Sequence, residues 1–539
     1  MVYVLLSQLG QTIAAYMMLG FEATYFPGID LSDLGYNRPV SFADLAPTGF
    51  NRNEAQKSTA LKLLAEQEGV EVDLESTEAK RVLRKIDMRI MPLVLGLYTL
   101  QLLDKNSLSF AATTGWAPLS SAWNNITSKI LFLSVMLTLF GYLFGEIPAA
   151  FMMQRVPLAK YLGVMSMLWG VVVALHAVCH NFGGLAAVRF LLGSIEVCTT
   201  PAIIYITSSW YTHAEQVTRV AIWYSTSGWA QVIGGFVAWA FNHADGFNWQ
   251  GLFIFYGALT FTTGVIVTFF LAASPIDASW LSDDEKKIAL ERVRHNKTGT
   301  EMWAFNMDQL KESFSDPRLY LIFLVTVATG LPNGGLTAFG TFTASSKQFL
   351  TDMKLLGFTG PTIISGFGFD TNTTTLLSMA PGACAAVGTV LALLVIKLTN
   401  RTIGGIFVIF LGCVGVIMML VIPEAAYTAR YGGYILTMQY PNAILVVLAF
   451  ITSGIGGSTK KLAFGASFQL GYAVGNICGP QTFKDSEAPH YFTAKYTMLA
   501  FLVCTGMLLA SIGTIHWYWN RKRDRQDALD AQSSVNDDY

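Results

Sequence analysis

The sequence predicts an all-α membrane protein whose twelve transmembrane helices form two halves of six. Hydrophobic residues make up 53% of its 539 residues and charged residues only 13%, which is about half the charged share of an ordinary soluble domain. Apolar runs of about 20 residues, the length that a helix needs to cross a bilayer, recur along the chain. One long polar interval separates six of these runs from the other six and predicts the two halves.

The composition also argues against several functional classes. The 35 Lys and Arg nearly balance the 36 Asp and Glu, so no basic excess points to a nucleic-acid partner. The six cysteines are scattered through apolar runs without a CxxC pair, which argues against a disulfide framework. His176, Cys179 and His180 cluster, but too few ligands surround them for a metal site, so we expect packing there. No HExxH, GxSxG or P-loop occurs, so neither an enzyme nor a cofactor is predicted.

The amino-terminal region, residues 1–80, is predicted to be a cytoplasmic arm. Its first 20 residues are apolar, but no Lys or Arg precedes Arg38, whereas a signal peptide begins with a positive segment. We therefore expect residues 1–20 to lie at the surface or to pack loosely, with an additional span as the alternative.

The amino-terminal half is predicted over residues 81–272. Its apolar runs lie near 90–112, 128–151, 160–178, 183–207, 218–241 and 250–272. The polar interval 273–317 follows as a cytoplasmic linker. Within it, Ser282 and Glu285 have the spacing of a capping box, in which two side chains satisfy the first free amides of a helix. A short surface helix is therefore predicted after Ser282.

The carboxy-terminal half is predicted over residues 318–518, and a cytoplasmic tail over 519–539. Its apolar runs lie near 318–343, 371–396, 402–422, 433–456, 462–480 and 494–518. In the first of these, Pro332 and the following Gly334-Gly335 predict an interrupted helix. Lys and Arg concentrate in the loops on the side of the amino terminus. By the positive-inside rule, both termini are expected in the cytosol.

Charged residues inside apolar runs are the leading candidates for a functional site, because each costs about 2.5–3.5 kcal/mol at the bilayer centre. Asp104 and Lys105 lie in the first run, about 21 Å along the helix from Ile90 and beyond the midplane. The functional interpretation makes Lys105 a point charge for a substrate carboxylate and Asp104 a group that gains and loses a proton. The alternative is an ion pair that locks helices together.

The fourth run carries two more charges, Arg189 and Glu196. The residues that recur there every four positions, and so follow one helix face, are Arg189, Gly193, Val197 and Pro201. Gly193 allows a neighbouring backbone to approach closely. Arg189 and Glu196 are candidates for coupling transport to a proton gradient. The alternative is a structural pairing of Arg189 with Asp104 or Glu196.

Polar side chains at helical spacing mark further candidates. Gln469, Tyr472 and Asn476 share one helix face of the eleventh run, and such a face should point away from lipid. Asn333 lies in the predicted interruption of the seventh run. Each is interpreted either as part of a site or as interhelical hydrogen bonding, worth about 0.6 kcal/mol on average. Glu146, near the inner end of the second run, is expected to be structural and to pair with cytoplasmic basic residues.

Several of these motifs resemble known families. The spacing of Arg189, Gly193, Val197 and Pro201 is similar to the fourth-span motif RxxxGxxxGxxxP of the major facilitator superfamily, with Val197 in place of one Gly. The closer resemblance is to fungal allantoate permeases of the anion:cation symporter family. It is carried by Leu103-Asp104-Lys105, Arg189–Gly193, Ser209-Trp210-Tyr211, Pro332–Gly335 and Gly475–Phe483. Residues 344–362 look like an insertion relative to that family.

The resemblance implies proton-coupled import of a small organic anion, such as allantoate or ureidosuccinate, by alternating access across a fungal plasma membrane. The residues expected to contact the substrate are Lys105, Asn333, Tyr472 and Asn476. Those expected to couple proton movement are Asp104, Arg189 and Glu196. The expected partners are the anion, protons and the lipid bilayer, and the protein is expected to be a monomer driven by the proton gradient. The alternatives are a drug or metabolite exporter of the same fold and a nutrient sensor that binds without transporting.

Overall fold

The structure, a computed structural model, is helical throughout its described residues. These are residues 76–113, 124–179, 181–243, 249–293, 307–342, 379–423, 426–482 and 492–537. The apolar start 1–20, the insertion 344–362 and His180 lie outside them. The first half contains α4 (Thr77–Thr113), α5 (Asn124–Met152), α6 (Leu158–Leu175), α7 (Phe182–Glu196), α8 (Thr199–Trp210), α9 (His213–His243) and α10 (Trp249–Phe270). These helices occupy the six apolar runs predicted for that half.

The second half occupies the remaining predicted runs. It contains α13 (Pro317–Phe342), α17 (Met379–Leu398), α18 (Arg401–Val421), α19 (Tyr427–Thr437), α20 (Ala443–Gly454), α21 (Ser458–Cys478) and α22 (Phe492–Asp537). Within the described ranges, nine helical segments are long and apolar enough to cross a membrane, and α5, α9 and α21 fill the other three predicted runs. The predicted helical membrane fold is therefore confirmed.

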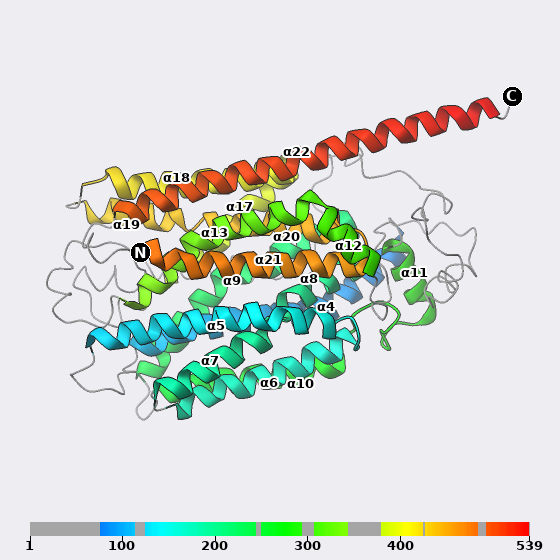
Figure 1. The fold of residues 1–539 in the computed structure, drawn as a ribbon. Helices are drawn as coiled ribbons and strands as arrows, with labels where there is room; N and C mark the ends of the chain where they lie inside the picture. Colours follow the sequence, from blue (N-terminus) through cyan, green and yellow to red (C-terminus); the bar gives the residue numbers. More distant parts are fainter. Residues whose placement is uncertain are drawn as a thin grey trace.

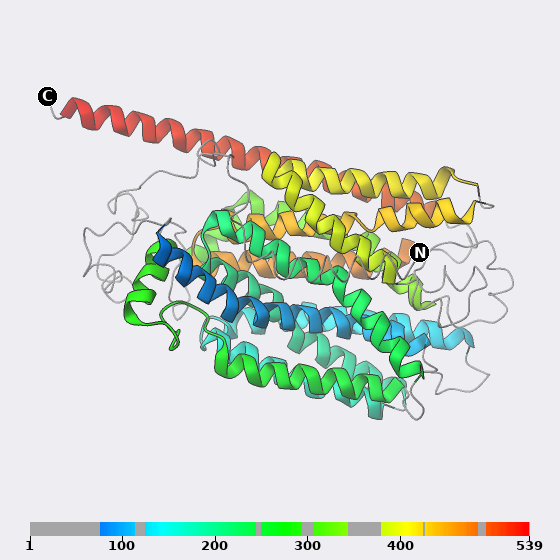
Figure 2. The ribbon, with the colours of Figure 1, turned by 180° about the vertical axis from the view of Figure 1, so that it is seen from behind.

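The helices run side by side, with α4 to α10 on one side of the bundle and α13 to α22 on the other (Figures 1 and 2). The linker helices α11 (Asp283–Val293) and α12 (Met307–Ser315) lie at one end of the bundle, which we call the linker end. The start of α4 lies there as well, and Lys85 Nζ is 2.6 Å from Glu285 Oε2 of α11. The far end of α22 also projects beyond the linker end (Figure 1).

The capping box predicted at the start of α11 is confirmed. The Ser282 amide donates to Glu285 Oε2 at 3.0 Å, and the Glu285 amide donates to Ser282 Oγ at 3.3 Å. Glu285 also accepts a hydrogen bond from Lys85, and these contacts hold the pKa of its carboxyl below the ordinary value. The capping residues therefore start α11 and also attach it to α4.

Two transmembrane runs are broken by proline, but the interruption predicted at Pro332 is wrong. Proline has no amide hydrogen, so Pro201 cannot donate to Val197 and Pro441 cannot donate to Thr437. The fourth run accordingly divides into α7 and α8, and the tenth into α19 and α20. By contrast, α13 continues through Pro332 without a break. A helix in a bundle tolerates an internal proline when its neighbours compensate the lost hydrogen bond.

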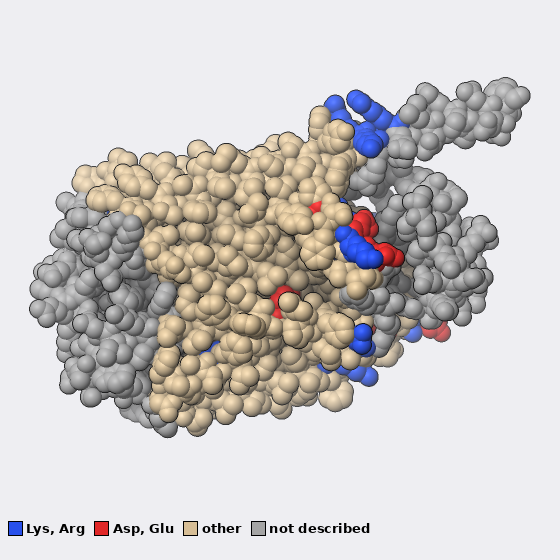
Figure 3. All heavy atoms as spheres, in the orientation of Figure 1, with Lys and Arg blue, Asp and Glu red and all other residues tan. Residues whose placement is uncertain are grey.

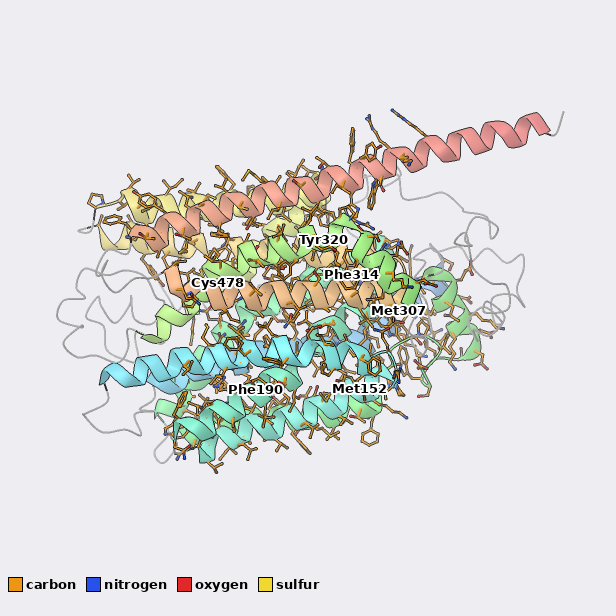
Figure 4. All side chains as sticks on the ribbon, viewed as in Figure 1. Met152, Phe190, Met307, Phe314, Tyr320 and Cys478 are labelled. Atoms are coloured by element: carbon orange, nitrogen blue, oxygen red, sulfur yellow. The ribbon has the colours of Figure 1, made fainter. Side chains whose placement is uncertain are left out.

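The surface is divided into a charged end and an apolar face, as expected of a membrane protein. In the view of Figure 3, acidic and basic side chains gather at the linker end, and the face between the two ends is almost entirely uncharged. Exposed side chains on this face include Met152 and Tyr320, which project outward near the linker end (Figure 4). Large apolar side chains such as Phe144, Ile147 and Phe269 are also exposed. Lipid tails rather than water suit such a surface.

At the linker end the two halves are in contact. Thr459 Oγ1 of α21 donates to Gln154 Oε1, just beyond α5, at 3.1 Å, and both residues are buried. Nearby, Gly465 of α21 packs against Pro201 of α8, where an added Cβ would lie 3.4 Å from the proline Cβ. We call these two contacts the linker-end seam. The seam joins the two halves along α21 at this end of the bundle.

Gly193 provides the close helix crossing that its spacing predicts, between α7 and α5. A Cβ added there would lie 3.2 Å from Gly141 Cα and would overlap the carbonyl oxygen of Thr138. Because backbone cannot yield as a flexible side chain does, overpacking of this kind costs about 1–3 kcal/mol.

We therefore expect Gly193→Ala to lower the melting temperature of the purified protein, measured by intrinsic fluorescence in detergent. The matched control is Gly432→Ala in α19, where an added Cβ meets no atom within 4 Å. This second substitution should be neutral or slightly stabilising, because alanine favours a helix over glycine. Equal melting temperatures for the two variants would contradict the crossing.

Candidate functional site

Asp104 is held inside the first half by an aromatic side chain. It lies on α4 with 1% of its surface exposed. The indole Nε1 of Trp169, on α6, donates to its Oδ2 at 3.0 Å. Ser107 Oγ, one turn along α4, donates to the Asp104 main-chain oxygen at 2.6 Å. The carboxyl group therefore accepts one short hydrogen bond from an uncharged donor, Trp169, and forms no ion pair within 4 Å among the described residues.

Lys105, the next residue, points to the other half of the protein. Its Nζ donates a hydrogen bond to the hydroxyl of Tyr472 on α21 and lies 4.3 Å from the centre of that ring. Lys105 as a whole is half-buried. The electrons of an aromatic face attract a cation and so stabilise its charge in apolar surroundings. Lys105 thus joins α4 to α21, between the two halves.

Asn333 and Asn476 complete this contact. Asn333 Nδ2, on α13, donates to Tyr472 Oη at 3.0 Å and to Asn476 Oδ1 at 2.7 Å. Asn476 Nδ2 donates to the main-chain oxygen of Tyr472 at 2.7 Å. The four residues predicted to contact substrate therefore form one hydrogen-bonded group from three helices, which we call the Lys105 cluster. It presents an ammonium group, a phenol and two amides, a set that suits a carboxylate with amide groups.

Arg189 lies close to Asp104 and Glu196 without an ion pair to either among the described residues. It is 3% exposed, and both carboxylates contribute favourable electrostatic interactions with its guanidinium group. Its Nε and Nη2 are buried and find no hydrogen-bond partner in that part of the chain. The alternative of a structural pairing is thus met only by electrostatic attraction, and no close ion pair of Arg189 with Asp104 or Glu196 is present among the described residues. Free guanidinium donors in apolar surroundings favour an incoming anion.

Glu196 is paired with a phenol instead of a base. Tyr142 Oη, on α5, donates to Glu196 Oε1 at 2.8 Å, and both side chains are buried. Three predicted coupling residues thus lie in the first half, where Asp104 and Glu196 each accept from an aromatic donor. Sequence reasoning missed Trp169 and Tyr142, because an aromatic residue in an apolar run is usually a packing residue.

Two further expectations concern histidine and Glu146. The ring of His176 stacks on Phe253 at 5.0 Å between centroids, and its Nδ1 lies 3.0 Å from the carbonyl oxygen of Val172. His176 is therefore a packing residue, as expected. Glu146, by contrast, does not pair with basic residues: both of its carboxyl oxygens are buried without a partner in the described ranges. That expectation is wrong.

Comparison with known proteins agrees with this architecture. A family model described as Major Facilitator Superfamily matches residues 95–480. An uncharacterized transporter of Schizosaccharomyces pombe is 34% identical over 460 residues, which are 84% of this chain and 83% of the relative. An allantoate permease of Saccharomyces cerevisiae is 29% identical over 507 residues, 90% and 88% of the two chains. A thiamine pathway transporter of the same yeast is 28% identical over 456 residues, 83% and 81%.

Solved structures share the fold at low sequence identity. The human organic anion transporter MFSD10 aligns with a TM-score of 0.56 at 12% identity, over 78% of this chain and 99% of that one. A partially occluded, inward-open structure of the xylose transporter XylE from E. coli aligns with a TM-score of 0.53 at 13% identity, over 79% and 98%. At this level of identity the likeness establishes the fold alone.

Proposed function

Because this chain belongs to the major facilitator superfamily, we propose that it imports a small organic anion together with protons across the plasma membrane. The anion is a ureido acid such as allantoate or ureidosuccinate, or a similar carboxylate. The protein works as a monomer with both termini in the cytosol. Its two halves expose the site alternately to the two sides of the membrane.

The Lys105 cluster is the observation that carries this proposal. Its ammonium group supplies the charge for a carboxylate, and the amides of Asn333 and Asn476 supply donors and acceptors for a ureido group. The cluster draws on α4 from one half and on α13 and α21 from the other. A ligand bound there touches both halves, so its binding can bias their relative position.

The position of Asp104 supports the coupling to protons. It adjoins Lys105 in sequence, is buried, and accepts from Trp169 without a close positive partner among the described residues. A carboxyl group in such surroundings binds a proton readily, because the charged form is poorly solvated. The similarity to the yeast allantoate permease supports the choice of ureido acids.

Radiolabelled uptake tests the proposal directly. Cells that express the protein should accumulate one or more ureido acids from a panel that also contains vitamins, and a protonophore should abolish the accumulation. Accumulation that survives the protonophore would contradict proton coupling. Efflux of preloaded compound without uptake would favour the exporter, and binding without movement in either direction would favour the sensor.

A further inference from the structure

Glu146 is a buried acid that the proposed mechanism does not use. It lies on α5, six residues before the helix ends at Met152 at the linker end. Glu146 is 1% exposed, and neither of its carboxyl oxygens has a hydrogen-bond partner in the described part of the chain. A buried carboxylate without a partner costs far more free energy than a chain of this size can spare. Burial without a partner therefore favours the neutral, protonated form of Glu146 in this conformation.

The surroundings of Glu146 offer no close counter-charge. Tyr161 of α6 and Cys198 before α8 lie close enough to interact with it electrostatically, and neither is a base. The titratable and charged groups on the described parts of the helices packed against α5 are Arg189 and Glu196 of α7, Arg318 and Tyr320 of α13, and Lys460, Lys461, Tyr472 and Cys478 of α21. None of these forms a described ion pair or hydrogen bond with Glu146.

Tyr142 lies one helical turn before Glu146 on α5 and contacts one of the predicted coupling residues. Its hydroxyl already donates to Glu196 at 2.8 Å. Tyr142 and Glu146 are four residues apart on α5, so they share one face of the helix with Cβ atoms about 5–6 Å apart. Glu146 is the nearer of the two to the linker end, by about 6 Å of helix rise. Glu196, Tyr142 and Glu146 thus form a series that leads toward the linker end.

The linker-end seam lies next on this route. α21 packs against both α5 and α8, and the Gln154–Thr459 hydrogen bond lies two turns beyond Glu146. Separation of α21 from these helices would admit water to the face of α5 that carries Glu146. Water would stabilise the ionised form of the carboxyl group. The state of the seam would therefore decide whether Glu146 keeps its proton.

We propose that Glu146 is the group that releases the coupled proton to the linker side when the seam opens. This inference rests on the proposed proton coupling. On opening, the Glu146 carboxyl group loses one proton to water. The Tyr142 hydroxyl, which donates to Glu196 in this conformation, then turns to the Glu146 carboxylate and gives it a proton. Tyr142 takes a proton in return from Glu196, after Glu196 has bound the coupled proton. One proton leaves Glu196, one enters the cytosol, and Tyr142 is unchanged.

Infrared spectroscopy of the purified protein in liposomes tests whether Glu146 holds a proton. The wild type should show a carbonyl stretching band of a buried, protonated carboxyl group at neutral pH, and Glu146→Gln should remove it. The matched control is Asp284→Asn in α11, whose carboxyl is 92% exposed, and which should leave the band in place. A Glu146→Gln spectrum identical to that of the wild type would overturn the proposal.

Proton flux in the same liposomes tests the release step, with allantoate as the probe and an internal pH dye as the readout. Glu146→Gln and Tyr142→Phe should each lower allantoate-driven proton entry by about a hundredfold or more, the scale lost with a positioned proton-transfer group. Exchange of labelled for unlabelled allantoate at equal pH should persist in both. Full proton entry in Glu146→Gln would overturn the inference, whereas a wild type that moves allantoate without protons would contradict the proposed function.

Discussion

Replacing Lys105 with alanine is expected to abolish uptake of the anion at low substrate concentration, while the protein still reaches the plasma membrane. The substitution removes the ammonium group from the Lys105 cluster and leaves Tyr472, Asn333 and Asn476 in place. A hydrogen bond to a charged group contributes about 1.5–3 kcal/mol, which corresponds to a loss of about tenfold to 150-fold in affinity. Initial uptake rates, measured over a range of substrate concentrations and corrected for surface protein, give the result.

The competing explanation is that Lys105 only fastens the two halves together through Tyr472. In that case Lys105→Ala would lower the melting temperature without removing the stabilisation that added substrate provides. Tyr472→Phe distinguishes the two, since it removes the hydroxyl contact and keeps the cation. Lys397→Ala, at the exposed end of α17, is the control for loss of a lysine. Normal uptake by Lys105→Ala would remove this residue from the site.

Much of the fold and of the candidate site could be predicted from the sequence, because both depend on patterns that lipid imposes. A charged side chain, or a row of polar side chains on one helix face, must point away from lipid when it lies in an apolar run. This rule alone predicts that Lys105, Tyr472 and Asn476 belong to an internal site. The breaks at Pro201 and Pro441 were not predicted, although Pro332 was expected to interrupt α13. Whether a proline breaks a helix depends on its packed neighbours, which local sequence does not specify.

The partners of the buried acids could not be predicted for a similar reason. Trp169 lies 65 positions from Asp104, and Tyr142 lies 54 positions from Glu196. Each is one aromatic residue among many in apolar helices, and its donor atom becomes meaningful only when the helices are assembled. Glu146 was misjudged because its position near a helix end suggests hydration, whereas the assembled bundle leaves only 1% of the residue exposed.

Asp104→Asn is expected to leave the protein able to move the anion across the membrane but unable to use the proton gradient to accumulate it. Asparagine retains an oxygen that accepts from Trp169, so the packing survives, but it cannot bind and release a proton. A pH difference of one unit supplies about 1.4 kcal/mol per proton, or about tenfold accumulation for one coupled proton. In liposomes with such a gradient, the wild type should concentrate the anion by about this factor. The variant should only equilibrate it, while exchange at equal pH continues.

A structural role for Asp104 makes a different prediction, because the carboxylate also stabilises the charge of Arg189 electrostatically. If that were its whole role, the double variant Asp104→Asn with Arg189→Gln would remove both charges. It would then recover the stability and the accumulation that Asp104→Asn alone had lost, as a double-mutant cycle measures. If Asp104 carries the proton, the double variant regains stability at most and still fails to accumulate. Asp308→Asn on α12, with a 92% exposed carboxyl, should behave as the wild type. Accumulation by Asp104→Asn that still follows the pH gradient would show that the coupled proton binds elsewhere.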